Sequence, residues 1–88
     1  MDAYSAGAAP FPLLLAAEGE RVRVVAMRGG RGMDRKLADL GLVVGSELMV
    51  VRHDSHGPMV VARDDLRLAL GTGIAHRVLV VRLQDSEK

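Results

Sequence analysis

The chain of 88 residues carries a net charge of +1, and its length allows one domain with a single modest core and little room for a deep active-site cleft. It has no cysteine, which excludes disulfides, thiolate metal sites and cysteine catalysis and favours a reducing, cytoplasmic location. The apolar segment 10–17 is too short to cross a bilayer and lacks a preceding basic region. We therefore expect a soluble protein with neither a membrane span nor a signal peptide.

The N-terminal part of the chain is predicted to contain a tail, a cap and one strand. We expect residues 1–10 to form a flexible tail and residues 11–83 to form the domain, followed by a C-terminal tail at 84–88. Residues 11–17 are interpreted as a short helix or as a cap over one end of a barrel. Apolar residues then alternate with arginines over 21–28, which predicts a half-buried strand.

A short helix is predicted after this strand. Its apolar residues recur at i, i+4 and i+7 and so share one helix face; they are Met33, Leu37 and Leu40. The residues before it include three glycines, which we interpret as a flexible loop that leads into the helix; these are Gly29, Gly30 and Gly32.

The end of this helix is the most informative feature of the chain. Gly41 can take a positive φ without a steric penalty, and Leu42 can then fold back onto Leu37 as in a Schellman motif. Gly45 is predicted to make a second turn before the next strand. Glycines that hold phosphate precede a helix, whereas these follow one, so we interpret both as architectural.

The rest of the chain reads as four further strands. They are predicted at residues 48–53, 59–63, 66–70 and 78–83. Turns separate them at 54–57, which contains Gly57, and at Asp64 and Asp65, and a single helical turn precedes the last strand. About five short strands in so few residues favour a mainly β, SH3-like small barrel, with the short helix inserted between strands one and two. An open α+β sheet is the alternative.

Positive charge gathers around the glycines and the helix. The candidate partner-binding residues are Arg28, Arg31, Arg35 and Lys36. Single-stranded nucleic acid is bound by stacking on aromatic side chains, but the only aromatic residues are Tyr4 and Phe11, near the N-terminus. We therefore expect an acidic protein partner and no nucleic acid. A solvated charged face without a specific partner is the alternative.

The sequence offers little chemistry of its own. No nucleophile, base and orienting group are placed to converge, and the glycine-rich stretch lacks the Lys-Ser or Lys-Thr pair of a phosphate-binding loop, so we expect no enzyme. His53 and His56, spaced around Asp54, are a weak candidate pair for Zn²⁺ or Fe²⁺. A specific site needs three or four ligands, so we expect no required cofactor; two solvated turn histidines are the alternative.

From about residue 11 to residue 83 the chain resembles the FeoA family of ferrous iron transport proteins. The residues that carry the resemblance keep the family's order and spacing: Leu13 to Gly19, Gly30, Arg35, Leu37, Leu40, Gly41, Leu42, Gly45, Gly57, Pro58, Leu68, Ala69, Leu70, Ala75 and Val80. The chain departs from the family at Val44, where proline is common, and at Asp64 and Asp65, where glycine is frequent. The same small barrel resembles the C-terminal domain of metal-dependent repressors, whose helix-turn-helix this chain lacks.

The resemblance implies a small cytoplasmic SH3-like protein that binds and regulates FeoB, the membrane ferrous iron transporter with a cytoplasmic GTP-binding domain. We expect a monomer or weak dimer that does not insert into the membrane. The alternative is a metal-handling protein that binds or senses ferrous iron or another divalent transition metal. Anaerobic calorimetric titration with Fe²⁺ separates the two, because the interaction module gives almost no heat and the metal-handling protein saturates.

Overall fold

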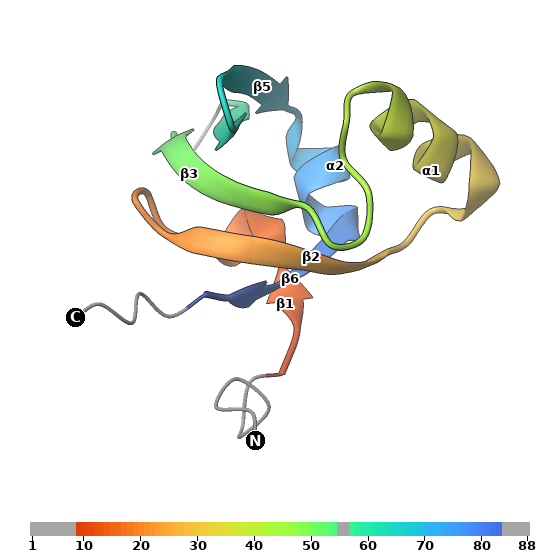
Figure 1. The fold of residues 1–88 in the computed structure, drawn as a ribbon, viewed down its shortest axis with the longest axis horizontal. Helices are drawn as coiled ribbons and strands as arrows, with labels where there is room; N and C mark the ends of the chain where they lie inside the picture. Colours follow the sequence, from red (N-terminus) through yellow and green to blue (C-terminus); the bar gives the residue numbers. More distant parts are fainter. Residues whose placement is uncertain (1–8, 55–56, 84–88) are drawn as a thin grey trace.

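A computed structural model describes residues 9–54 and 57–83. Their strands form one antiparallel six-stranded sheet in the order β1-β6-β2-β3-β4-β5 (Figure 1). The strands are β1 (Phe11–Pro12), β2 (Arg21–Met27), β3 (Glu47–His53), β4 (Met59–Arg63), β5 (Leu66–Leu70) and β6 (Val78–Arg82). The 3₁₀ helix η2 (Leu13–Leu15) and the helices α1 (Gly30–Asp39) and α2 (Thr72–Arg77) complete the fold. The predicted mainly β class with a helix between the first two long strands is confirmed.

The structure differs from the sequence prediction at the ends of the sheet. Where residues 11–17 were expected to form a helix or cap, Phe11 and Pro12 instead pair with β6 and only three residues make a 3₁₀ turn. This additional strand raises the number from about five to six. Among the described residues β1 pairs only with β6 and β5 only with β4, so hydrogen bonding leaves the sheet open between these two edges.

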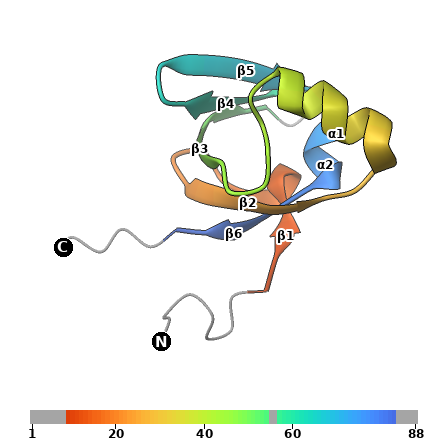
Figure 2. The same cartoon turned by 45° about the vertical axis from the view of Figure 1, so that its right-hand side comes forward.

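The core lies inside the curled sheet, and strand alternation explains which side chains reach it. Along β2 the buried residues are Val22 and Val24, and along β3 they are Leu48 and Val50. The remaining fully buried side chains of large volume come from η2, α1, the turn after α1, β4, β5 and β6: Leu13, Leu37, Leu42, Met59, Val61, Leu70, Val78 and Val80. Figure 2 shows α1 and α2 at one side of the curled sheet. No helix in the described ranges is long and apolar enough to cross a membrane.

Helix α1 begins earlier than the sequence predicted. Gly30 and Gly32 were expected in a flexible loop, but both lie in the first turn of the helix, and Gly29 is its N-cap residue with a φ of 124°. The prediction of a glycine loop at these two positions is wrong. Met33 and Leu37 pack on or beside the core and so hold the helix in place, which outweighs the low helix propensity of Gly32. Gly30, the first residue of the helix, has a φ of 81°, which glycine adopts without a steric penalty.

Helix α1 ends at Asp39 with Leu40 as its C-cap, and Gly41 follows with a φ of 88°. The backbone N–H of Leu42 donates to the carbonyl of Leu37 at 2.8 Å, and that of Gly41 donates to Ala38 at 2.8 Å. These are the two hydrogen bonds of a Schellman motif. They reverse the chain, and Leu42 is fully buried in the same core cluster as Leu37.

The chain between Gly41 and β3 is tied down by backbone and side-chain hydrogen bonds. Gly45 has a φ of 100°, and its N–H donates to the carbonyl of Val24 at 2.7 Å. The buried Ser46 hydroxyl accepts the N–H of Val43 at 3.1 Å and donates to the carbonyl of Gly41 at 3.4 Å. This connection therefore fixes where α1 stands relative to β2 and β3. Gly57 differs from both turns, because its φ is not positive.

Candidate partner-binding surfaces

The four cations selected from the sequence lie on or just before α1. Arg28 directly follows β2, and its backbone N–H donates to the carbonyl of Arg77 at 2.8 Å, which fixes the start of the connection to the helix. The other three belong to α1 itself, and all four are exposed. They make no ion pair within residues 9–54 and 57–83.

The helix does not gather all four cations on one face. Arg31 and Arg35 stand one turn apart and point away from the face that carries Met33 and Leu37, since residues four apart share a helix face. Lys36 is turned by roughly 100° from Arg35, because each helical residue advances by that angle. The structure thus brings Arg31 and Arg35 together on the outer side of α1 and places Lys36 on its flank.

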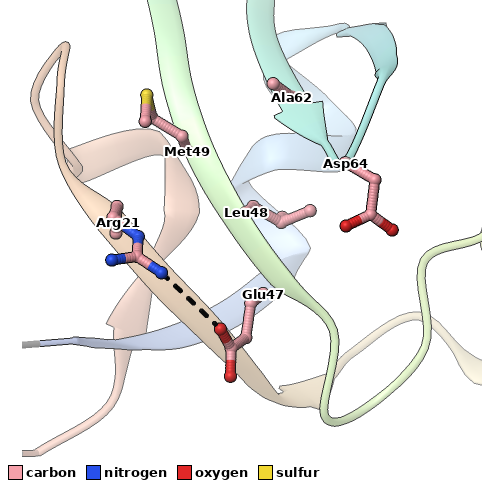
Figure 3. Close-up of a pocket in the computed structure, with 6 residues that line it drawn as sticks. All are labelled: Arg21, Glu47, Leu48, Met49, Ala62 and Asp64. Atoms are coloured by element: carbon pink, nitrogen blue, oxygen red, sulfur yellow. Dashed lines mark ion pairs between the residues drawn. The ribbon is translucent and has the colours of Figure 1, made fainter.

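A shallow pocket of about 220 Å³ lies across β2, β3 and the turn end of the β4–β5 hairpin. Its lining residues are Arg21, Glu47, Leu48, Met49, Ala62 and Asp64. Figure 3 shows the ion pair of Arg21 with Glu47 along one side and the Asp64 carboxylate on the other. Both signs of charge are therefore present in this pocket, and Glu47 already has its partners within the chain.

Glu47 is held by two arginines of β2. Arg23 donates a hydrogen bond to its carboxylate at 2.6 Å, and Arg21 approaches it at 3.9 Å. The hydrogen bond from Arg23, together with its positive charge, lowers the pKa of Glu47. These two arginines are thus occupied in fastening β2 to β3 and are less available to a partner than the cations on α1.

A second hollow, of about 360 Å³, opens on the outer face of the sheet. It is lined by Val51, Arg52, Val60 and Arg67, which come from β3, β4 and β5. This surface was not predicted from the sequence. The sequence does contain a sign of it at alternate positions of β4. Val60 and Ala62 face away from the core and are nevertheless apolar.

His53, one member of the predicted metal pair, is the last residue of β3. Its backbone N–H donates to the carboxylate of Glu18 at 2.8 Å, and its ring Nδ1 lies 3.3 Å from the carbonyl oxygen of Ala16. His56 lies outside the described residues. Within the described ranges no three His, Asp or Glu side chains come close enough to hold a metal ion. The weak metal site at His53 and His56 stays a prediction.

The chain is similar in sequence to proteins of one family. The FeoA domain pattern matches residues 11–82. A protein of Methanocaldococcus jannaschii, proposed as an Fe(2+) transport protein A, is 34% identical over 70 residues, which cover 80% of this chain and 84% of the relative.

Solved structures share the fold. The crystal structure of an iron uptake regulatory protein, FeoA, matches with a TM-score of 0.80 and 32% identity, covering 85% of this chain and all of the other. The FeoA protein of Chlorobium tepidum matches with a TM-score of 0.76 and 29% identity over 88% of this chain and 74% of its own. A manganese-dependent transcriptional repressor matches with a TM-score of 0.78 and 26% identity, over 86% of this chain but only 43% of the repressor. These likenesses confirm the predicted SH3-like fold, and the chain belongs to the FeoA family.

Proposed function

We propose that this protein is a small cytoplasmic accessory of a FeoB-type ferrous iron transporter, which binds the transporter's cytoplasmic GTP-binding domain and regulates iron uptake without catalysing a reaction of its own. The observation that carries the proposal is the FeoA domain match over residues 11–82, together with a relative and a solved structure whose names refer to Fe(2+) transport and iron uptake.

The fold supports a binding role because its surface side chains are held on a rigid frame. The sheet, the Schellman end of α1 and the bonds of Ser46 fix the connection between α1 and β3. Binding to such a surface costs little conformational entropy, because the surface is already ordered, and this favours affinity.

The cations on α1 suit the first encounter with an acidic partner. Arg31 and Arg35 are exposed, share one face, and make no ion pair within the described residues. Arginine also pairs with carboxylates through two parallel hydrogen bonds. Charges at the rim of an interface chiefly raise the association rate, and salt screens them. Arg28 and Lys36 add to the same positive field from the strand end and the helix flank.

Surface plasmon resonance tests both parts of the proposal. The immobilised cytoplasmic domain of the cognate FeoB is exposed to wild-type protein at two salt concentrations, with and without guanine nucleotide. Wild type should bind, and R31E/R35E should associate about tenfold more slowly at low salt and lose most of its salt dependence. Its thermal unfolding should match wild type within about 0.5 kcal/mol, because both side chains are exposed.

The outcomes distinguish an error in the proposed function from an error in the proposed binding surface. If wild type fails to bind under every nucleotide condition, the transporter-accessory function is wrong. If wild type binds and the folded R31E/R35E variant associates at the same rate, the function stands and α1 is an ordinary solvated face.

A further inference from the structure

The outer face of β3, β4 and β5 combines an apolar floor with arginines. Residues opposite each other in antiparallel strands share a face, and the register pairs Met49 with Ala62 and Ala62 with Arg67. The same rule places Arg52, Val60 and Ala69 together in a second row. Met49 is 43% exposed, and Val60 and Ala62 are half-buried. This set of residues, with Val51 at the irregularity in β3, is named the outer sheet face.

The outer sheet face is recessed where its side chains are short. Val60 on β4 stands between Arg52 on β3 and the strand β5 that carries Arg67, and the hollow of about 360 Å³ opens above it. With strands roughly 5 Å apart and the rows of Arg52 and Arg67 about 7 Å apart along the strands, the two arginine backbones lie about 12 Å from each other. That separation equals the diameter of an α-helix.

The charge of this hollow has one sign. Its four lining residues include two arginines and no acid. Neither arginine makes an ion pair within the described residues, whereas Arg21, Arg23 and Arg82 each have a carboxylate partner there. The pocket in Figure 3 shares Met49 and Ala62 with the outer sheet face and contains Glu47 and Asp64, so these acids lie beside the hollow and not among its lining residues. Carboxylates on an incoming segment would therefore meet two guanidinium groups and no repulsion inside the hollow.

We propose that the outer sheet face binds an acidic amphipathic helix of the partner protein, with apolar side chains on Val51 and Val60 and carboxylates on Arg52 and Arg67. The assignment rests on the proposed function, because it places this helix in the cytoplasmic part of the transporter. A strand added at the free edge of β5 would approach Arg67 but not Arg52, which lies two strands away. Only a segment lying across the face meets both.

This surface and α1 have different kinetic roles. The cations on α1 have no apolar floor, so they guide the approach. On the outer sheet face the guanidinium groups border an apolar surface that loses water when covered, and charge pairs in such places control dissociation.

The test is surface plasmon resonance on the immobilised FeoB cytoplasmic domain with R52E/R67E, compared with R31E/R35E, which makes the same change of charge on α1. R52E/R67E should dissociate about tenfold faster or more than wild type, while R31E/R35E should keep the wild-type dissociation rate. Thermal unfolding of both variants checks that they are folded. R52Q/R67Q, which removes charge without reversing it, replaces the first variant if that fails to fold and should also dissociate faster.

Three results overturn the assignment in different ways. Wild-type dissociation from folded R52E/R67E or R52Q/R67Q rejects the outer sheet face while leaving the proposed function intact. A wild-type protein that never binds the FeoB domain rejects the function and this assignment together. Sedimentation of the protein alone tests whether a second copy of this chain occupies the face instead. If the protein self-associates, and R52Q/R67Q abolishes this self-association while transporter binding is unchanged, the face binds a second copy.

Discussion

Two regions fasten this small sheet by opposite means. The glycine turn, residues 40–46, joins α1 to β3 through left-handed backbone at Gly41 and Gly45 and the buried hydroxyl of Ser46. The charged seam, formed by Phe11, Glu20 and Arg82, joins β1, the residue before β2, and β6 through side chains at the surface. There Arg82 donates to Glu20 and lies over the Phe11 ring, 4.7 Å from its centroid.

The two regions show which kind of contact stabilises this domain more. In the glycine turn, other residues are excluded by backbone conformation, and water cannot easily replace a bond made by the buried Ser46. In the charged seam the Arg82 side chain is 61% exposed, so water competes for the same groups and salt screens them. We therefore expect substitutions in the glycine turn to lower stability more than substitutions in the charged seam.

The largest effect is expected from Gly41→Val. A branched residue is strained at a φ of 88°, and a Cβ at this position would lie 3.3 Å from Nη1 of Arg63, which must then move. The free energy of unfolding should fall by about 1–3 kcal/mol, measured by urea unfolding monitored by circular dichroism. A variant as stable as wild type would show that the turn does not determine stability here.

Gly32→Ala is the matched control. Gly32 lies in the first turn of α1, has no positive φ, and a Cβ there meets no atom within 4 Å. Replacing glycine by alanine in a helix should raise stability by about 0.5–1 kcal/mol. Opposite signs for the two glycine substitutions would separate a required left-handed conformation from ordinary helix propensity.

A smaller loss is expected from Ser46→Ala. The change removes the acceptor for the Val43 N–H and the donor to the Gly41 carbonyl. The expected cost is about 1 kcal/mol, read from the same urea transitions. Val43→Ala is the control, because it keeps the backbone N–H and trims a side chain that is 45% exposed. Equal losses from both would mean that packing of Val43, and not the hydrogen bond, matters.

The sequence predicted most of the fold because its signals are local. The spacing of Met33 and Leu37 indicated the helix, and Gly41 indicated its end, since few residues accept positive φ. The strands followed from alternation, and β4 was predicted with the bounds that the structure has. The start of α1 was misplaced because packing of Met33 and Leu37 outweighed the low helix propensity of Gly32.

The candidate surfaces were much less predictable, because they depend on which strands become neighbours. Arg52 and Arg67 come together only through the pairing of β3 with β4 and of β4 with β5. The partners Glu20 and Arg82 are 62 residues apart. Clustering along the chain drew attention to Arg28, Arg31, Arg35 and Lys36, but helical geometry turns Lys36 away from Arg35.

The smallest effect is expected in the charged seam, from Glu20→Gln. The N–H of Ala17 and the side chain of Arg82 both donate to the Glu20 carboxylate, and these bonds lower its pKa below the ordinary 4.5. Because the folded pKa is lowered, the carboxylate adds stability above about pH 4.5, and this contribution is lost as the pH falls through the folded value. Glutamine can still accept from Ala17 through its amide oxygen, so the substitution isolates the charge.

Urea unfolding of wild type and Glu20→Gln at pH 7 and at pH values below 4.5 measures this contribution. At pH 7 the free energy of unfolding of the variant should be lower by under about 1 kcal/mol, since Arg82 is 61% exposed although Glu20 is only 26% exposed, and the gap between the two proteins should narrow as the pH falls. High salt at pH 7 should narrow it as well, because exposed charges are screened. A gap that stays the same in acid and in salt would show that Glu20 acts through packing, and one larger than the loss from Gly41→Val would reverse the order of importance of the two regions.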